Sequence, residues 1–285
     1  MLQHAFVRSP ILRPMLPVKL HPHTQLPRLF TVALCLLLGL IVGCAQQSNL
    51  RYSGPANAPT EKIISLTDDN QDGMPEGWRK LLIRADKTRT VFTPIRKDGM
   101  DVVQADAESS ASGLHFNLRV DSQASPWIGW HWKVANLITQ ADITQRSKED
   151  SPVRLILGFD GDKTKLPFKE QMLLNMGKVM AGHEVPYATL VYVWDNQQPQ
   201  NTHIPHAVTD RIKMIVVESG DSKLGQWQHY MRNYAADYEK AYGEKPGPLI
   251  SIGILSDTDN TGDTARAWYG PLSISQQPLR SPHLP

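Results

Sequence analysis

The chain has 285 residues, of which 41% are hydrophobic and 20% are charged. This is the composition of an ordinary globular protein, and it argues against wholesale disorder and against a polytopic membrane protein. The formal net charge is +2, but residues 1–43 hold four of the 30 basic residues and none of the 28 acidic ones, so the rest of the chain has a net charge of about −2. Because a nearly neutral chain has no overall field that attracts nucleic acid, we do not expect nucleic acid as a partner.

The N-terminal residues 1–43 resemble a bacterial lipoprotein signal peptide. The run from Leu29 to Gly43 carries no charge, and as a helix it would span about 22 Å, which is too short for a hydrocarbon core of roughly 30 Å. Basic residues precede the run, and a small residue and Cys44 follow it, which is the order found in cleaved signals. We expect Cys44 to be acylated, for example with palmitate, and to anchor the mature protein in the membrane. Cys35 would be removed, so the mature protein would have no disulfide.

The residue after the cysteine and the composition beyond it predict where the protein is located and how it is divided. Ala45 follows Cys44, and resemblance to the Gram-negative sorting rule then implies an outer-membrane lipoprotein with its domain in the periplasm. Residues 44–60 are polar and contain Gly, Pro and Asn, which predicts a flexible tether. We expect one folded domain over residues 61–276 and a disordered tail over residues 277–285.

The hydrophobic pattern of this domain predicts a mainly β fold. Apolar side chains alternate with small or polar ones over many short runs, which is the period of a strand with one buried face. The runs are 128–134, 153–159, 190–194, 212–217, 250–254 and 272–274. Many short alternating strands predict a jelly-roll-like antiparallel β-sandwich.

Two segments have the period of a helix instead, with apolar residues three and four positions apart. We expect both apolar stripes to pack into the core, and the second helix to end at Gly243. The first stripe is Phe168, Met172, Met176 and Val179, and the second is Trp227, Tyr230, Tyr234, Tyr238 and Ala241.

An acidic loop near the start of the domain has the first half of a calcium-binding pattern. Asp68, Asn70 and Asp72 are oxygen ligands at alternate positions, and a glycine follows them. The twelfth position holds Arg79 rather than the bidentate glutamate of an EF-hand. Because Asp, Asn and Gly also form ordinary turns, calcium and a solvated turn both remain open here.

A second acidic loop follows the predicted strand at 250–254. Asp257, Asp259 and Asp263 lie within seven residues, and three such carboxylates repel unless they are exposed, protonated or bridged by a cation. A hard cation such as calcium, held by these carboxylates and by Thr261, is one interpretation. A solvated turn is the other.

Aromatic and charged residues supply the candidate ligand-binding groups. Trp127 and His131 alternate to the face opposite the predicted core, and Trp194 leads into a polar loop that begins with Asp195. Aromatic rings beside such polar groups suit sugars, which stack on the rings and form hydrogen bonds through their hydroxyls. Trp194 is also a natural core residue. Arg154 lies on an apolar strand, so its charge must be paired or exposed. It could hold a carboxylate such as Asp160, or an anionic ligand.

The order of several motifs resembles the bacterial domain-of-unknown-function family numbered 3047, over roughly Glu61 to Ser275. His131 stands where members of the family often carry Arg, and the acidic residue before the Pro-x-Arg step is spread over Glu149 and Asp150. The resemblance implies a single fold unit and no particular reaction. The motifs are Trp130–Val134, Asp150–Arg154, Tyr192–Trp194, Val217–Gly220 with Trp227, Arg232, Asp237–Tyr238, Asp257–Gly262 and Tyr269–Gly270. The resemblance favours Arg154, Asp257, Asp259 and Thr261 as site residues.

Three functions are compatible with the sequence. The first is a module that binds a glycan or another polar ligand of the cell envelope. The second is a glycan-acting hydrolase with paired carboxylates drawn from Asp160, Asp195 and Asp257. The third is a structural lipoprotein that docks on another envelope protein. The motifs of P-loop, dinucleotide-binding, α/β-hydrolase and zincin enzymes are absent from the sequence.

Overall fold

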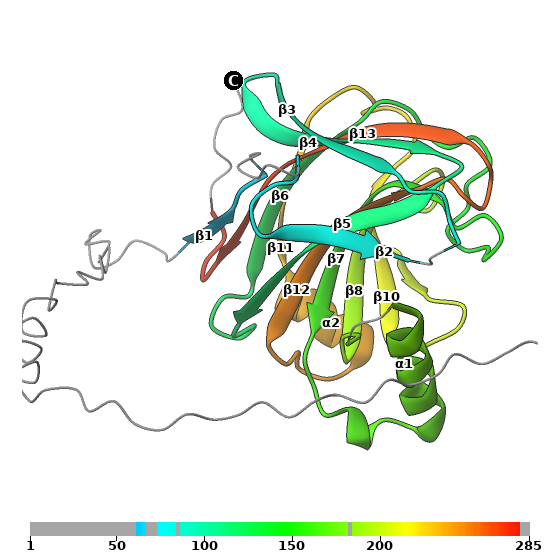
Figure 1. The fold of residues 1–285 in the computed structure, drawn as a ribbon. Coiled ribbons are helices and arrows are strands. Elements are labelled where there is room, and N and C mark those ends of the chain that lie inside the picture. The colour runs from blue at the N-terminus through cyan, green and yellow to red at the C-terminus, as the bar shows by residue number, and fades with distance from the viewer. Residues whose placement is uncertain (1–60, 67–72, 84–85, 182–183, 280–285) are drawn as a thin grey trace, which may run out of the picture. The chain divides into compact units, whose positions relative to one another are not determined.

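The computed structural model describes residues 61–66, 73–83, 86–181 and 184–279 (Figure 1). The predicted signal peptide with Cys44, the predicted tether, and the loop of Asp68, Asn70 and Asp72 lie outside these residues. Within the described ranges, no helix is both long enough and apolar enough to cross a membrane.

The first sheet contains six of the described strands, and all of its pairs are antiparallel. Its long strand β13 pairs with β6 on one side. On its other side, β13 pairs first with β4 and then, nearer its C-terminal end, with β1. The strands are β1 (Glu61–Ile64), β3 (Val91–Lys97), β4 (Met100–Glu108), β6 (Trp127–Val134), β11 (Gln228–Asn233) and β13 (Thr264–Ser275).

The second sheet contains seven of the described strands, in the order β2-β5-β12-β7-β8-β10-β9. Its pairs are antiparallel except β8 and β10, which run parallel. The strands are β2 (Trp78–Leu82), β5 (Ala111–Val120), β7 (Ser151–Phe159), β8 (Ala188–Asp195), β9 (His203–Pro205), β10 (Ile212–Ser219) and β12 (Leu249–Asp257). A short 3₁₀ turn (Lys163–Lys165) precedes the helix α1 (Phe168–Ala181), and α2 (Tyr234–Tyr242) follows β11.

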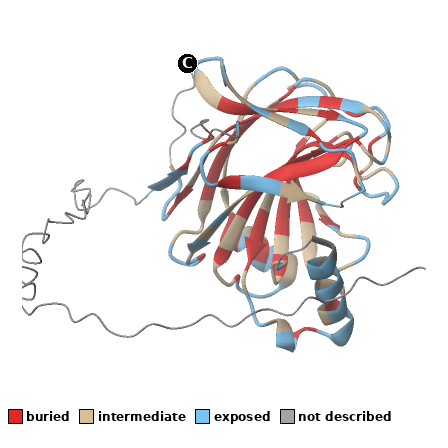
Figure 2. Cartoon of the chain, viewed as in Figure 1, coloured by how far each residue is buried: buried red, intermediate tan, exposed pale blue. Residues whose placement is uncertain are grey.

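The core lies between the two sheets, as the strand period predicts. In β7 the side chains from Val153 to Phe159 at every second position are fully buried, and in β6 the same is true from Ile128 to Val134. Figure 2 shows these buried residues running along the strands of both sheets. The prediction of a jelly-roll-like, mainly β sandwich with two helical segments is therefore confirmed.

An aromatic stack crosses the middle of the core. The ring of Trp130 lies 5.0 Å from that of Tyr192 in the second sheet and 5.0 Å from that of Tyr230 on β11, both nearly parallel to it. Trp132 meets Trp130 edge-on at 5.5 Å. Stacked and edge-on pairs of this kind stabilise a core beyond the area that they bury.

The predicted second helix is correct only in its second half. Gln228–Asn233 forms strand β11 along the open edge of β6, and helix α2 begins at Tyr234, where the side chain of Asn233 accepts the N–H of Ala236. The backbone of this segment gains ladder hydrogen bonds from β6, which override its local helical period. Gly243 ends α2 in the left-handed conformation, as expected.

The predicted first helix is present, but its apolar stripe does not pack into the core. Phe168, Met172, Met176 and Val179 are 80%, 47%, 53% and 83% exposed. Figure 2 shows most of α1 in the colour of exposed residues. The prediction of core contacts for this stripe was wrong, because the period of a helix does not say which way its apolar face points.

Candidate functional site

Arg154 and Asp257 form a buried ion pair at one end of the second sheet. The guanidinium donates from Nε to Oδ1 and from Nη2 to Oδ2 of the carboxylate, both at 3.1 Å. Strand pairing brings the two groups together, because Leu255 lies opposite Arg154 and Asp257 opposite Ser151. Arg154 is 7% exposed and Asp257 is 9% exposed, so the pair is largely withdrawn from water.

Asp150, just before β7, holds the loop that follows β12. Its carboxylate accepts hydrogen bonds from the backbone of Asn260 at 3.2 Å and from the backbone and hydroxyl of Thr261 at 2.8 and 2.7 Å. Asp150 is 2% exposed. The loop from Asp257 onward is therefore tied to the start of the neighbouring strand rather than left as a free turn.

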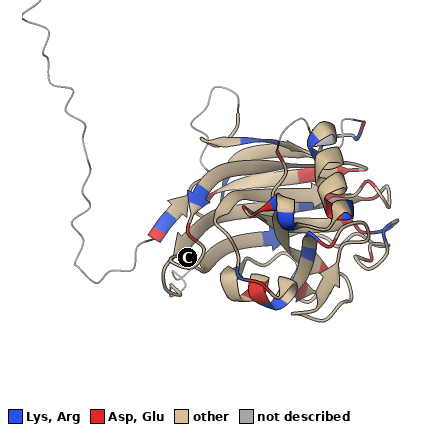
Figure 3. Ribbon diagram, turned by 90° about the horizontal axis from the view of Figure 1, so that it is seen from below, with Lys and Arg blue, Asp and Glu red and all other residues tan. Residues whose placement is uncertain are grey.

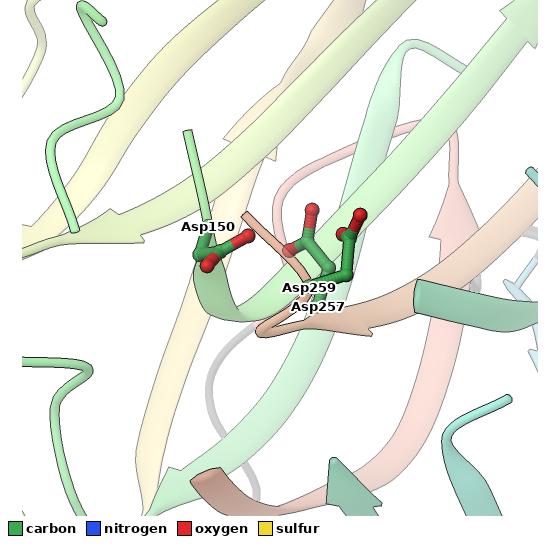
Figure 4. A group of neighbouring side chains, drawn as sticks. All are labelled: Asp150, Asp257 and Asp259. Atoms are coloured by element: carbon green, nitrogen blue, oxygen red, sulfur yellow. The ribbon is translucent and has the colours of Figure 1, made fainter. Parts of the chain in front are cut away.

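Asp150, Asp257 and Asp259 form a carboxylate cluster, in which one oxygen from each residue lies within 4.8 Å of the others. Figure 4 shows the three side chains gathered where β7 begins and β12 ends. The guanidinium of Arg154 balances the negative charge of Asp257, and the ammonium of Lys87 forms an ion pair with Asp259.

The environment of Asp257 disfavours its charge. Burial raises the pKa of this carboxyl to about 6; the guanidinium of Arg154 opposes that rise, and the negative charge of Asp150 adds to it. A carboxyl with a raised pKa beside two other carboxylates has the electrostatics of a shared proton or of a site for a cation.

The residues predicted to hold a cation are only partly brought together. Asp257 and Asp259 lie in the carboxylate cluster, whereas Thr261 donates to Asp150. Asp263 points elsewhere, because it accepts the N–H groups of Thr139 at 3.0 Å and of Thr264 at 2.7 Å. The hydrogen bond from Thr264 has the largest effect and that from Thr139 the next largest, and together they hold the pKa of Asp263 below its usual range.

Trp194 and Asp195, predicted to bind a ligand, have structural surroundings. The indole of Trp194 is fully buried and donates to the carbonyl of Gly220 at 3.0 Å. Asp195 accepts the N–H groups of Gln197 at 2.8 Å and Gln198 at 2.6 Å, so it shapes the turn after β8. Neither side chain offers a free face to a ligand in this structure.

Trp127 and His131 lie on the face of the first sheet that is opposite the core residues Trp130 and Trp132; Trp127 is half-buried, and His131 is only 9% exposed. We call this side the outer face of the first sheet. His131 faces His229 of β11 across the pair, with Nε2 and Nδ1 of the two rings 2.9 Å apart. The other nitrogen of His131 lies 3.3 Å from the carbonyl of Pro271.

The two imidazoles are linked in a chain that fixes their tautomers. Because the carbonyl of Pro271 can only accept, Nδ1 of His131 carries its proton, and Nε2 of His131 then accepts from His229. Burial lowers the pKa of His131. Burial, and then the neighbouring His131, lower the pKa of His229 to about 4. The pair is therefore neutral at physiological pH.

Next to the imidazoles, two tryptophans alternate with two lysines. The ammonium of Lys133 lies 5.9 Å from the ring centres of both Trp227 and Trp268, and that of Lys97 lies 4.5 Å from Trp268. Asp98 accepts from the indole of Trp227 at 2.8 Å and from Lys133 at 3.1 Å. Trp268 is only 9% exposed, whereas Trp227 is partly open to solvent.

Sequence reasoning missed Asp150 in the carboxylate cluster and His229, Trp227 and Lys133 on the outer face. The motif before Arg154 includes Asp150, but its place in the cluster depends on the pairing of β7 with β12, which has no local signal. His229 was placed on a predicted helix, which concealed its position opposite His131. An alternation test on Gln228–Asn233 would have been the one available signal.

The sequence profile of the family described as "Protein of unknown function (DUF3047)" matches residues 76–273. The chain belongs to this family. The match covers both candidate regions of the DUF3047 domain, from β2 to β13. No curated protein matches the chain.

Solved structures resemble the DUF3047 domain in fold. The K2 cleaved adhesin domain of Lys-gingipain has a TM-score of 0.35 at 8% identity, over 75% of this chain and 99% of that chain. Endoglucanase 3 of Trichoderma harzianum, from family GH12, has a TM-score of 0.38 at 8% identity, over 78% and 99%. A mutant of the family 29 carbohydrate-binding module CBM29-2 has a TM-score of 0.30 at 11% identity, over 77% and 94%. At these scores and identities the likeness carries no inference about the ligand or the activity of this chain.

Proposed function

We propose that this protein is a cell-envelope lipoprotein whose domain binds a glycan on the outer face of the first sheet. The observation that carries the proposal is the pair of half-buried side chains Trp127 and Lys133 on the outer face of β6, with the partly open ring of Trp227 beside Lys133. His131 lies between Trp127 and Lys133 but is only 9% exposed. At about 3.3 Å per residue, Trp127 and Lys133 lie roughly 20 Å apart along the strand. A row of this length can contact several sugar units of one chain.

The chemistry of the row suits sugars. The apolar faces of Trp127 and Trp227 can stack on pyranose rings. Lys133 and Asp98, already joined at 3.1 Å, offer a donor and an acceptor to hydroxyl groups. At the proposed site two lysines, Lys97 and Lys133, accompany one carboxylate, Asp98. On the side of the loops and helices, Figure 3 shows basic and acidic residues interspersed. A neutral or weakly anionic glycan fits such a surface better than a highly charged one.

Glycan hydrolysis is a second candidate, favoured by the carboxylate cluster. Retaining glycosidases hold two carboxyl groups about 5 Å apart, one of them with a raised pKa. The cluster has carboxylate oxygens within 4.8 Å, and burial raises the pKa of Asp257 to about 6. However, both carboxylate oxygens of Asp257 accept hydrogen bonds from Arg154, and the carboxylate of Asp150 accepts hydrogen bonds from Thr261 in the loop after β12. The other predicted carboxylates are engaged as well, Asp160 with Arg119 and Asp195 in its turn. We therefore rank binding above hydrolysis.

The binding experiment uses the mature protein and a panel of envelope polysaccharides and peptidoglycan fragments, read by pulldown and by titration of tryptophan fluorescence. We expect Trp127→Ala and Trp227→Ala each to weaken binding of the recognised glycan at least tenfold, which corresponds to about 1.4 kcal/mol. Phe168→Ala, at an exposed aromatic on α1, is the matched control and should leave binding unchanged. Absence of binding across the panel, or equal binding by all variants, would overturn the proposal. Shortened glycan products that disappear with Asp257→Asn would support hydrolysis instead.

The lipid anchor is tested separately. Cells grown with an alkyne-tagged fatty acid should label the wild-type protein and not the Cys44→Ser variant. The labelled protein should fractionate with the outer membrane, as Ala45 after the cysteine implies. Label on both proteins, or on neither, would refute acylation at Cys44 and leave the proposed glycan site unaffected.

A further inference from the structure

The helix α1 turns four apolar side chains to solvent and its acidic side chain inward, while Leu173 and Leu174 are half-buried. Phe168 and Val179, near its two ends, are 80% and 83% exposed, and Met172 and Met176 between them are 47% and 53% exposed. Glu170 is only 5% exposed. A helix on a globular protein usually turns such an apolar stripe to the core and its charged side chains to solvent. We call Phe168, Met172, Met176 and Val179 the α1 stripe.

The orientation of α1 is fixed by contacts with the domain. The carboxylate of Glu170 accepts from the hydroxyl of Thr209 and, at 3.4 Å, from the N–H of Asp210. The amide of Gln171 donates to the carbonyl of Leu166 at 2.8 Å. Rolling the helix to bury its stripe would break these bonds and leave a buried carboxylate without partners. The domain therefore holds the α1 stripe outward.

Lysines surround the stripe. Lys169 and Lys178 belong to α1 and are exposed, and Lys163 and Lys165 lie in the turn before it. Glu184 pairs with Lys163 and Lys178, and Asp162 pairs with Lys165. These pairs are exposed, so solvent screens them and their lysines can exchange a carboxylate for a phosphate. Long basic side chains beside an apolar stripe can rest their methylene groups on it and extend their charges toward lipid phosphates.

We propose that the α1 stripe inserts into the surface of the phospholipid bilayer that holds the N-terminal anchor, so that the protein contacts its membrane at two points. The proposal rests on the anchor at Cys44 proposed above. An amphipathic helix with an apolar stripe and flanking lysines binds in the plane of the interface, with the stripe among the acyl chains.

The length of chain between the anchor and the domain allows this contact. Sixteen residues separate Cys44 from Glu61, and fully extended they reach about 55 Å. A domain of this size has a radius of gyration of roughly 17 Å and a diameter of about 44 Å. The extended tether is therefore about as long as the domain is wide, and the proposal requires α1 to come within that reach of the anchor.

The size of the stripe favours lipid over a protein partner. The helix has 14 residues, so it is about 21 Å long, and a strip of that length and roughly 10 Å width presents only about 200 Å². A stable protein interface buries about 800 Å² on each partner. The four apolar side chains are too few for a stable dimer but are enough for a weak membrane contact that the anchor reinforces.

The test uses the domain from residue 45 onward, which lacks both cysteines of the chain. Every strand that the structure describes lies between Glu61 and Ser275, so this protein keeps both described sheets. It is mixed with vesicles of phosphatidylethanolamine and phosphatidylglycerol, which contain no glycan, and separated by flotation. We expect the wild type to float with the vesicles, and Phe168→Ser/Met172→Ser to lose at least tenfold in vesicle partitioning. Val91→Ser, at a 59% exposed position on β3, is the matched control and should float as the wild type does.

A second readout places the stripe in the lipid. Met172→Cys and Val91→Cys, each labelled with an environment-sensitive dye, should differ on addition of vesicles. The dye at residue 172 should shift to the blue and the dye at residue 91 should not. Three results would overturn the proposal: no flotation of the wild type, equal flotation of the stripe variant, or a dimer in sedimentation that the stripe variant abolishes. None of these results depends on acylation of Cys44 or on glycan binding, so a failure here is separate from a failure of the proposed function.

Discussion

The guanidinium of Arg154 and the carboxylate of Asp257 face each other in a bidentate, buried ion pair that joins β7 to the end of β12. The side chains of Arg154 and Asp257 are only 8% and 13% exposed. Removing one partner leaves the other as an uncompensated buried charge, which costs more than the pair itself contributes.

We therefore expect Arg154→Met to lower the free energy of unfolding by about 3–5 kcal/mol, measured by urea denaturation at pH 7. Arg154→Met/Asp257→Leu should recover part of that loss, because neither charge remains. Arg119→Met is the matched control: its pair with Asp160 has side chains 66% and 41% exposed, and we expect a change below about 1 kcal/mol. Equal losses for Arg154→Met and Arg119→Met would contradict the structural role that we assign to the buried pair.

The strands and the sandwich could be predicted from the sequence because their signal is local. In β7, Val153, Leu155 and Leu157 alternate with side chains of the opposite face, and the structure buries all three in the core. The meeting of Arg154 with Asp257 could only be assumed, because it depends on β7 lying beside β12 in a particular register. No local pattern encodes strand order, and the same limitation concealed Asp150.

The direction of α1 shows a different limit. Phe168, Met172 and Met176 have the spacing of a core-facing stripe, and the sequence offers no reason to turn them outward. The direction is set by Glu170, which reaches Thr209 from 39 residues away in the chain. A contact of that separation cannot be read from a helical period, so the prediction failed at this point while the helix itself was correct.

The aromatic stack predicts a sharp contrast between two tryptophans. Trp130 is 1% exposed and stacks on Tyr192 and Tyr230, so Trp130→Ala should lower the free energy of unfolding by about 3–5 kcal/mol. Trp227→Ala removes a partly exposed ring, and we expect a loss of about 1 kcal/mol. Thermal denaturation of both variants checks the contrast. A Trp227→Ala loss as large as that of Trp130→Ala would mean that Trp227 is a core residue and not a free surface ring.

The calcium hypothesis now makes a specific prediction at the carboxylate cluster. If a calcium ion bridges Asp150, Asp257 and Asp259, millimolar calcium should raise the melting temperature of the wild type, and a concentration tenfold above the Kd corresponds to about 1.4 kcal/mol. Asp259→Asn should abolish this gain, whereas Asp263→Asn, whose side chain lies outside the cluster, should retain it. Magnesium is the competing ion for comparison. A melting temperature that calcium leaves unchanged would mean that Arg154 and Lys87 alone compensate the three carboxylates.

Asp150 has a structural role that does not depend on a metal. Asp150→Ala deprives the backbone N–H groups of Asn260 and Thr261 and the hydroxyl of Thr261 of their acceptor. We expect a loss of about 2–3 kcal/mol in calcium-free buffer, since buried donors are left unsatisfied. Amide hydrogen exchange of the loop after β12 should rise at the same time. Unchanged exchange in this loop, with stability preserved, would refute the contact.

The imidazole pair predicts how stability depends on pH. The pKa of His229 is about 4 in the folded protein and about 6.5 in an exposed histidine. Between these values the unfolded state holds more protons than the folded state, so the contribution of His229 to stability is fully present above pH 6.5 and is lost as the pH falls toward 4. The ring is only half-buried, and with solvent screening we expect the free energy of unfolding to fall by about 1 kcal/mol at pH 5.

The variant His229→Gln lacks this pH-dependent loss. The free energy of unfolding of the wild type should therefore move about 1 kcal/mol closer to that of the variant as the pH falls from 7 to 5. Urea denaturation of both proteins at constant ionic strength measures the difference, and parallel pH curves would show that His229 titrates as freely in the fold as in the unfolded chain.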